Sequence, residues 1–361
     1  MDRIKVGVVG ATGYSGAELV RLLLSHPGVE LVFATSEQQA GKSLRQALPH
    51  LGGPHDLRLQ LRPLDPAALA GEAEVVFLCL PHGVSMDAVE VFLEGGCRVI
   101  DLGADFRFRD PAVYKAWYAK PHARPDLLSE AVYGLPELHR NLLSGPGAGT
   151  APGTRARLVA NPGCYPTGAI LALAPLVTRG LIERNTIIVD SKSGVSGGGR
   201  APKLDFHFPE CNENIKAYRV GRHQHTPEIE QELSRLSAEP VTLTFTPHLV
   251  PMTRGILTVA YGTLARPLDT RGILACFRED YRAEPFIRVL DQEEFPETKH
   301  VAGTNRCHLG ARVDTRTGRV VVVTAIDNLL KGAAGQAVQN LNVLLGLPET
   351  TGLAGLQAYW P

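Results

Sequence analysis

The chain has 361 residues, enough to bury the cores of two domains rather than one. Its 37 Lys and Arg balance its 37 Asp and Glu, so no net charge points to nucleic acid or an anionic membrane as a partner. Six widely spaced cysteines without a C-x-x-C pair predict reduced thiols in the cytoplasm, and they argue against a disulfide framework or a structural zinc site.

The N-terminal segment predicts a βαβ unit. An apolar strand over Ile4–Val9 begins almost at once, so we expect no signal peptide, and no apolar run is long enough to span a membrane. A glycine-rich turn, an apolar helix over 17–24 and a second strand over Val29–Thr35 follow. Such a turn can present backbone N–H groups to a pyrophosphate, or it can simply be tight. The dinucleotide-site candidates are Gly10, Thr12, Gly13, Tyr14, Ser15 and Gly16.

Strands and helices continue to alternate as far as residue 160. Strands are predicted over Val75–Leu80, Arg98–Leu102 and Leu158–Ala160, with a helix over Ser85–Glu94. This order is typical of a Rossmann-type, doubly wound parallel sheet in an α/β protein. Pro81 lies at the carboxyl edge of that sheet, where ligands bind in such folds. The Gly- and Pro-rich segment 144–157 reads as a solvated loop without an assigned function.

The second half of the chain has a different pattern. Longer, more β-branched strands are separated by loops rather than by regular helices, which predicts a second, α+β domain with a mostly antiparallel sheet. We predict a dinucleotide-binding domain over 1–163, a catalytic and oligomerisation domain over 164–326 and a C-terminal segment over 327–361 that holds a helix. The strands expected in the second domain are Thr186–Asp190, Val241–Thr246, Ile256–Thr263 and Val320–Ile326, and the final helix is Gly332–Leu345.

Cys164 lies between an apolar strand end and a helix-forming run, in the segment NPGCYPT (161–167). A cysteine at a helix N-terminus is close to unpaired N–H groups and to the positive end of the helix dipole. Both favour a thiolate and would stabilise an oxyanion on an attacked carbonyl. The alternative is a buried cysteine that only packs.

Two histidines precede a predicted helix that we expect Thr226 to cap and Pro227 to open. His223 and His225 can exchange a proton with a thiol or a substrate oxygen. The alternative is that they are only surface residues, which the presence of Cys164 argues against, and the lack of matching ligand spacing argues against a metal.

Two further segments contain candidate anion-binding groups. SKSGVSGGGR (191–200) follows a strand, and its glycines predict either a clamp of backbone N–H groups or a flexible hairpin. Arg107 lies just past a strand end, where a guanidinium can bind a carboxylate or phosphate in a bidentate way, or form a surface salt bridge.

The ordered motifs of nearly the whole chain resemble those of the N-acetyl-γ-glutamyl-phosphate reductases. These motifs are GATGYSG from Gly10, LPHG from Leu80, DLGADFR from Asp101, YGLPE from Tyr133, NPGCYPT from Asn161, SGVSGGGR from Ser193, NENIKAY from Asn212, PHLVPMTRG from Pro247 and DNLLKGAAGQA from Asp327. The fold also resembles aspartate-semialdehyde dehydrogenase, which implies that the C-terminal helix returns to the dinucleotide-binding domain.

The resemblance implies a reaction. Cys164 attacks an acyl phosphate, phosphate leaves, and the thioester is reduced by NADPH to N-acetylglutamate semialdehyde. His225 is then the general acid/base and His223 orients it or the substrate. The resemblance places Asn328 near the nicotinamide, and we add Ser193 and Gly194 to the cofactor contacts. The substrate-binding candidates are Arg107, Asn161 and Arg254, and no metal is expected.

Glu37 complicates the choice between NADP and NAD. A carboxylate just after the second strand favours the ribose hydroxyl of NAD, and many relatives have a basic residue there. Ser36 and Lys42 can still bind a 2′-phosphate, and we predict NADP.

Two rival functions remain open from the sequence. One is the reductase of lysine biosynthesis that acts on a carrier-linked aminoadipyl phosphate, and the other is a nucleotide-binding regulator that has lost its chemistry. Intact cysteine, glycine and histidine motifs argue against both. We expect a small-molecule substrate and a homodimer or homotetramer, with no nucleic-acid or membrane partner.

Overall fold

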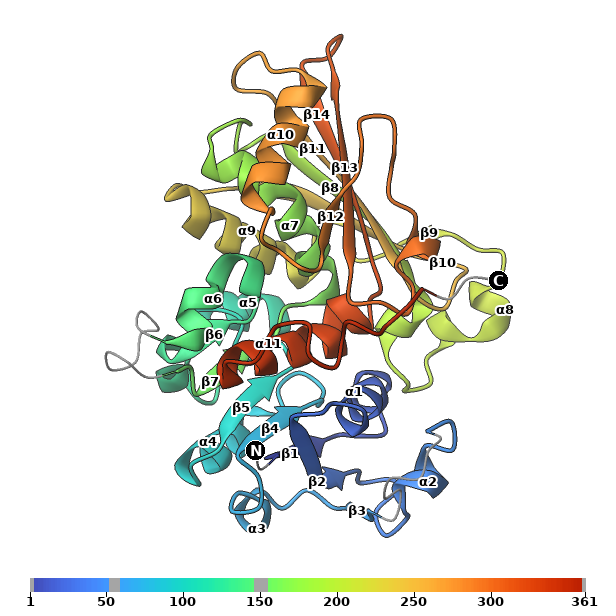
Figure 1. The fold of residues 1–361 in the computed structure, drawn as a ribbon. Helices are drawn as coiled ribbons and strands as arrows, with labels where there is room; N and C mark the ends of the chain where they lie inside the picture. Colours follow the sequence, from blue (N-terminus) through green and yellow to red (C-terminus); the bar gives the residue numbers. More distant parts are fainter. Residues whose placement is uncertain (1–2, 52–58, 146–154, 359–361) are drawn as a thin grey trace. The chain divides into compact units, whose positions relative to one another are not determined.

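The computed structural model describes residues 3–51, 59–145 and 155–358 (Figure 1). The chain divides into two compact units. The first comprises Met1–Pro162 and Ala333–Gly355, and the second comprises Gly163–Gly332 and the residues from Leu356 onward. In the described ranges, every helix is too short or too polar to cross a membrane.

The first unit contains a seven-stranded parallel sheet, so the predicted Rossmann-type sheet is confirmed. Its strand order is β3-β2-β1-β4-β5-β7-β6. The order changes direction between β1 and β4, and ligands bind beyond the carboxyl ends of strands at such a switch point. The strands are β1 (Ile4–Val9), β2 (Val29–Thr35), β3 (Leu61–Arg62), β4 (Val75–Leu78), β5 (Arg98–Asp101), β6 (Ala131–Tyr133) and β7 (Leu158–Ala160).

Helix α11 belongs to this first unit although it comes last in the chain. It packs against α1, α6 and β5. The other helices of this unit alternate with its strands along the sequence. The helices of the unit are α1 (Tyr14–Leu24), α2 (Leu44–Ala47), α3 (Pro66–Leu69), α4 (Met86–Glu94), α5 (Pro111–Tyr118), α6 (Pro136–Ser144) and α11 (Gly335–Leu345).

Helix α11 is buried on all sides, including its polar residues, and three of its buried side-chain amides form hydrogen bonds. Asn340 donates to the Gly134 carbonyl at 2.8 Å, and Asn342 Oδ1 accepts from His26 Nε2 at 2.9 Å. Gln339 donates to Glu137 at 3.0 Å. A π-helical turn, Leu330–Ala334, precedes the helix.

The second unit contains a mixed sheet in which most neighbouring pairs are antiparallel, as predicted. The strand order is β12-β13-β14-β11-β8-β10-β9. Alternate residues of the central strands are buried, so one face of the sheet forms a core and the other is partly exposed. The strands are β8 (Ile187–Gly194), β9 (Lys216–Ala217), β10 (Leu243–Val250), β11 (Ile256–Thr263), β12 (Ile287–Val289), β13 (Cys307–Asp314) and β14 (Arg319–Ile326).

Helices cover the buried face, so the expectation of loops between these strands is wrong. Helix α7 packs on β11 and β14, α9 on β10 and α10 on β13. Helices α9 and α10 are amphipathic and have many charged residues on their outer faces. Because these charges interrupt the apolar runs, the helical periodicity of the two segments was not recognised in the sequence. The helices are α7 (Cys164–Thr178), α8 (Phe208–Cys211), α9 (His225–Ser237) and α10 (Thr270–Asp280).

Two loop expectations also change. Residues Ser191–Gly194 continue strand β8 rather than following it, because they pair with β10 and β11 despite their polarity. Of the segment 144–157, Ser144 ends α6 and 155–157 lead into β7, while residues 146–154 lie outside the described ranges.

Candidate active site

The glycine-rich turn of the first unit has the shape of a phosphate cradle. Gly10 has a φ of +78°, and a Cβ at Gly16 would lie 2.2 Å from the Gly10 carbonyl oxygen, so only glycines permit this turn. Gly13 is the N-cap of α1 and no side chain caps this end, which leaves the first N–H groups of the helix for a ligand. Thr12, Tyr14 and Ser15 lie in the same turn.

The end of β2 is joined to this turn. The hydroxyl oxygens of Thr12 and Ser36 are 2.7 Å apart. Glu37, the residue that favours NAD, accepts a hydrogen bond from the Leu64 N–H at 2.8 Å. Its carboxylate therefore has a structural role, whereas Ser36 lies beside the glycine-rich turn.

The turn after β4, which includes Pro81, is held by Asp105. The Gly83 N–H donates to Asp105 at 2.7 Å, and the hydroxyls of Ser85 and Tyr114 donate to it at 2.8 Å. Burial, together with the nearby Asp105 carboxylate, raises the pKa of Asp101 to about 7.

Arg107 and Asn161 are buried in the first unit and both have structural hydrogen bonds. Arg107 donates to the carbonyls of Asn161 and Leu102, each at 2.8 Å, so it does not form a surface salt bridge. The Asn161 amide donates to the Ala333 carbonyl at 3.1 Å and accepts from Asn340 at 2.9 Å. These bonds join the end of β7 to the start of α11.

Cys164 is the first residue of α7, in the second unit, and it is partly exposed. Its position at a helix N-terminus is the one that favours a thiolate. A Cβ at Gly332 would lie 2.9 Å from the Cys164 Cβ, so the glycine in the π-helical turn leaves space for the cysteine.

His225 begins α9, so the expected cap at Thr226 and start at Pro227 are wrong. Pro227 is the third residue of α9 rather than the first, and it is tolerated there because the first N–H groups of any helix lack helical partners. The His223 ring accepts a hydrogen bond from the His225 N–H at 3.1 Å. Burial, and next Arg219, lower the pKa of His223 to about 4, so its ring is neutral at pH 7.

An aromatic cluster brings the two histidines to the residue next to Cys164. The Tyr165 ring centre is 5.5 Å from that of His223 and 5.8 Å from that of His225. The Tyr218 hydroxyl donates to the Tyr165 hydroxyl at 3.1 Å. Burial raises the pKa of both phenols, that of Tyr218 to about 12, so both remain neutral donors.

The 194–196 turn is bound to the loop 252–255 rather than free to clamp an anion. The N–H groups of Gly194, Val195 and Ser196 donate to carbonyls of that loop at 2.9, 2.9 and 3.1 Å. Asn328 strengthens the joint, since it donates to Ser196 at 2.9 Å and accepts from the Gly255 N–H at 2.8 Å. The N–H groups of 194–196 are therefore occupied, and Val195–Gly198 forms a short 3₁₀ turn rather than a hairpin. The anion clamp predicted from the three glycines 197–199 stays a prediction.

Arg254 lies on the same loop and is the more accessible of the two candidate substrate arginines. Its guanidinium is 3.5 Å from Asp327, and its side chain is 25% exposed. Asp327 is fully buried and accepts from the N–H groups of Leu329 and Gly303, both at 2.8 Å. The carboxylate faces one end nitrogen, Nη1, of the guanidinium, while a quarter of the arginine side chain remains exposed to solvent.

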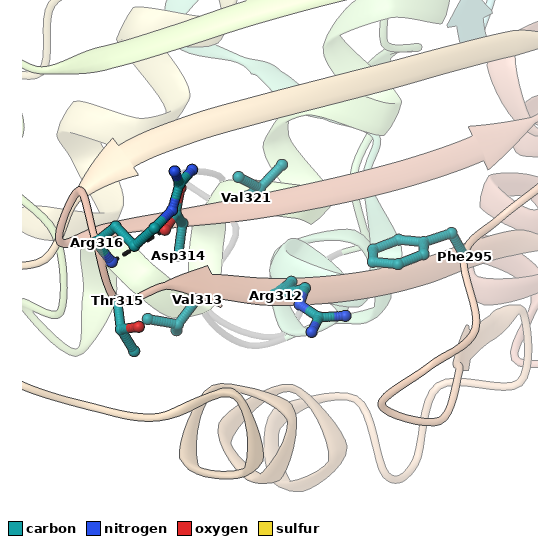
Figure 2. A pocket seen from close by; sticks show the side chains of 7 residues that line it. All are labelled: Phe295, Arg312, Val313, Asp314, Thr315, Arg316 and Val321. Atoms are coloured by element: carbon teal, nitrogen blue, oxygen red, sulfur yellow. Dashed lines mark hydrogen bonds and ion pairs between the residues drawn. The ribbon is translucent and has the colours of Figure 1, made fainter.

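The β13–β14 hairpin has a surface hollow that contains none of the predicted catalytic, cofactor-binding or substrate-binding residues. Figure 2 shows Arg316 beside Asp314, with which it forms an ion pair at 3.2 Å. Arg312 likewise pairs with Glu293 at 3.2 Å, so both cations are already neutralised. Within the described ranges, no cluster of three or more His, Cys, Asp or Glu residues could bind a metal ion. The hollow is lined by Phe295, Arg312, Val313, Asp314, Thr315, Arg316 and Val321.

Comparison with known proteins gives the family. Residues 164–328 match the family described as "Semialdehyde dehydrogenase, dimerisation domain", and residues 5–145 match "Semialdehyde dehydrogenase, NAD binding domain". The chain is 55% identical over 350 residues to the N-acetyl-gamma-glutamyl-phosphate reductase of Desulforudis audaxviator, covering 97% of this chain and 98% of the relative. The chain belongs to the N-acetyl-gamma-glutamyl-phosphate reductase family. The relative from Symbiobacterium thermophilum is 54% identical over 359 residues, covering 99% of both chains.

Solved structures agree on the fold of this reductase family member. The aspartate semialdehyde dehydrogenase with NADP from Candida albicans has a TM-score of 0.69 at 20% identity, covering 95% of this chain and 99% of that one. The Vibrio cholerae aspartate semialdehyde dehydrogenase II complexed with ASA has a TM-score of 0.70 at 17% identity, covering 96% and 99%.

The candidate residues fall into two groups. The glycine-rich turn, Ser36, Pro81, Arg107 and Asn161 lie in the first unit. In the second unit, the residue next to Cys164 contacts both histidines, and Asn328 joins the 194–196 turn to the Arg254 loop. Sequence reasoning missed Glu228 and Asp327. Asp327 could have been found, because it is a carboxylate directly after a predicted strand and directly before the candidate residue Asn328.

Proposed function

We propose that this chain catalyses the NADPH-dependent reduction of N-acetyl-L-glutamyl 5-phosphate to N-acetyl-L-glutamate 5-semialdehyde, with release of phosphate, as a step of arginine biosynthesis. The observation that carries the proposal is the 55% identity to a reductase of that name over 97% of the chain. The arrangement of Cys164 and the histidines around Tyr165 supports it.

Cys164 is the proposed nucleophile. Its thiolate attacks the acyl phosphate carbon, the C–O bond to phosphate breaks, and a thioester remains on the sulfur. After reduction of that thioester, the C–S bond breaks, the aldehyde leaves and the thiolate is restored. The N-terminus of α7 stabilises the thiolate both before it attacks the acyl phosphate and after the aldehyde has left.

His225 is the proposed general acid/base, and His223 positions it. At the start of α9, His225 can take the thiol proton and later return a proton to the substrate oxygen. His223 is neutral and accepts a hydrogen bond from the His225 backbone N–H, so it fixes the backbone at the start of α9. Arg254 is the proposed partner of an anionic substrate group.

NADP(H) fits the first unit. The proposed pyrophosphate site consists of Gly10, Gly13, Gly16 and the uncapped start of α1. Ser36, beside Thr12 of the same turn, is the proposed hydrogen-bond donor to a 2′-phosphate. Pro81, Ser193, Gly194 and Asn328 remain proposed contacts. When bound, the nicotinamide supplies the hydride that reduces the thioester.

We also propose a homodimer or homotetramer formed through the partly exposed face of the second sheet. On that face Tyr261 pairs with Ile188 on one side and Val321 on the other, and Val259 pairs with Val323. Ile188 is 37% exposed, so an apolar strip is open to a second copy. Free, scattered cysteines fit a cytoplasmic location. Sedimentation analysis would test the assembly, since a monomer at micromolar concentration contradicts it.

The reverse reaction tests the activity. Absorbance of the reduced nicotinamide would be followed with N-acetylglutamate semialdehyde, inorganic phosphate and either NADP or NAD, with the wild-type protein beside Cys164→Ser. Phosphate-dependent reduction that is lost in the variant and is faster with NADP is expected. A folded wild-type protein that binds NADP but shows no turnover would refute the assignment.

A further inference from the structure

The two proposed catalytic residues have equivalent positions in two helices that pack against each other. Cys164 is the first residue of α7, and His225 is the first residue of α9. Helices α7 and α9 lie side by side in the second unit (Figure 1). The separation of thiol and imidazole therefore depends on how the N-terminal ends of the two helices are held together.

One buried side chain joins these ends directly. Glu228 is fully buried in the first turn of α9, and its Oε1 accepts the Gly163 N–H at 2.8 Å. Gly163 is the N-cap of α7 and the residue before Cys164. Because Glu228 lies three positions after His225, the two side chains share one face of α9. A single carboxylate thus caps the nucleophile's helix from the helix that begins with the acid/base.

A carboxylate suits this place for two reasons. Burying an acidic group is costly unless it is hydrogen-bonded, and here it receives an N–H that α7 cannot satisfy internally. Negative charge is also stabilised at a helix N-terminus, and Glu228 lies at the N-terminal ends of both α7 and α9. The alternative is that Glu228 is an ordinary buried polar residue of α9.

We propose that Glu228 is a positioning residue for the reaction. Through its hydrogen bond to Gly163, it holds the first turn of α7 in register with the first turn of α9 and so keeps Cys164 within reach of His225. The inference rests on the proposed function. It predicts that loss of this bond slows the chemistry and leaves substrate binding nearly intact.

Three substitutions and a matched control test it. Glu228→Ala removes the acceptor, Glu228→Asp withdraws it by one methylene, and Glu228→Gln retains an oxygen that can accept the Gly163 N–H. The control is Glu232, one turn further along α9, which is also fully buried but pairs with Arg235 at 3.1 Å. Steady-state kinetics in the reverse direction and thermal melting would be measured for each variant.

The expected pattern is a split between kcat and KM. Displacement of a reacting group by about 1 Å can cost about 100-fold, so we expect that loss in kcat for Glu228→Ala and Glu228→Asp. KM should stay within about threefold, Glu228→Gln should retain kcat within about tenfold, and Glu232→Ala should retain it within about twofold. If Glu228→Ala does not fold, the comparison of the Asp and Gln variants decides.

Three results would overturn the inference. They are a wild-type kcat in a folded Glu228→Ala or Glu228→Asp variant, a Gln variant as slow as the Asp variant, and an equal loss in Glu232→Ala. The Cys164→Ser variant keeps this test separate from that of the function. An inactive Cys164→Ser beside a fully active Glu228→Asp would refute only the positioning role.

Discussion

Gly332→Ala measures how tightly the protein holds its nucleophile. The added Cβ would lie 2.9 Å from the Cys164 Cβ and 3.3 Å from its Cα. Carbon atoms in contact are normally about 3.5–4.0 Å apart, so the cysteine or the π-helical turn must move by roughly 0.6–1 Å. Overpacking of this kind costs about 1–3 kcal/mol, and the better helix propensity of alanine offsets about 1 kcal/mol.

Two measurements separate the consequences of that shift. The free energy of unfolding should fall by only about 0–2 kcal/mol, whereas kcat should fall by about 100-fold because the sulfur is displaced from its reacting position. Gly71→Ala is the control, since a Cβ there meets nothing within 4 Å. Wild-type kcat in Gly332→Ala, measured by NADP reduction with the semialdehyde and phosphate, would show that Cys164 tolerates the crowding and would refute the reasoning.

Three further predictions concern other parts of the molecule. Gly16→Ala places a Cβ 2.2 Å from the Gly10 carbonyl oxygen and should abolish NADPH binding in a fluorescence titration; unchanged affinity would contradict the cradle. Because the pKa of His223 falls to about 4 on folding, its stabilising contribution is present above pH 6.5 and is lost toward pH 4. Urea unfolding of wild type should lose about 2 kcal/mol more than His223→Gln between pH 7 and 5, and parallel curves would exclude this. The pKa of Asp101 is raised by burial and Asp105 to about 7, so its contribution falls as pH rises from 4 through 7. In Asp101→Asn that fall should be smaller, and an identical pH profile would contradict the burial argument.

Apolar periodicity predicted the first unit well. β1 and β2 have the predicted bounds, because buried parallel strands read as continuous apolar runs between glycine turns. β8 extends four residues beyond its predicted end, through Ser191–Gly194, because their hydrogen bonds to neighbouring strands are invisible in sequence. β13 was missed, since a histidine, a glycine and two charged residues interrupt its apolar residues, although most of the strand is buried.

The candidate site was predictable only in part. Local context identified Cys164 at a helix start, since a strand, a turn and a helix former surround it. Glu228 was not predictable, because a glutamate in a charged amphipathic helix is typical of a solvent-exposed face. Only the packing of α9 against α7 shows that its carboxylate caps another helix. The roles proposed for Ser193, Asn328 and Arg254 stay predictions.

The late position of α11 in the chain has a consequence for synthesis. A ribosome completes Gly163–Gly332, the main part of the second unit, before it makes the helix that fills the first. Until Gly335–Leu345 emerges, the partners of that helix on α1, α6 and β5 remain uncovered. The unit that is begun first thus receives its last helix only after the main part of the second unit has been made. Its closure requires contacts between residues more than 300 positions apart, such as His26 with Asn342, and such long-range contacts slow folding.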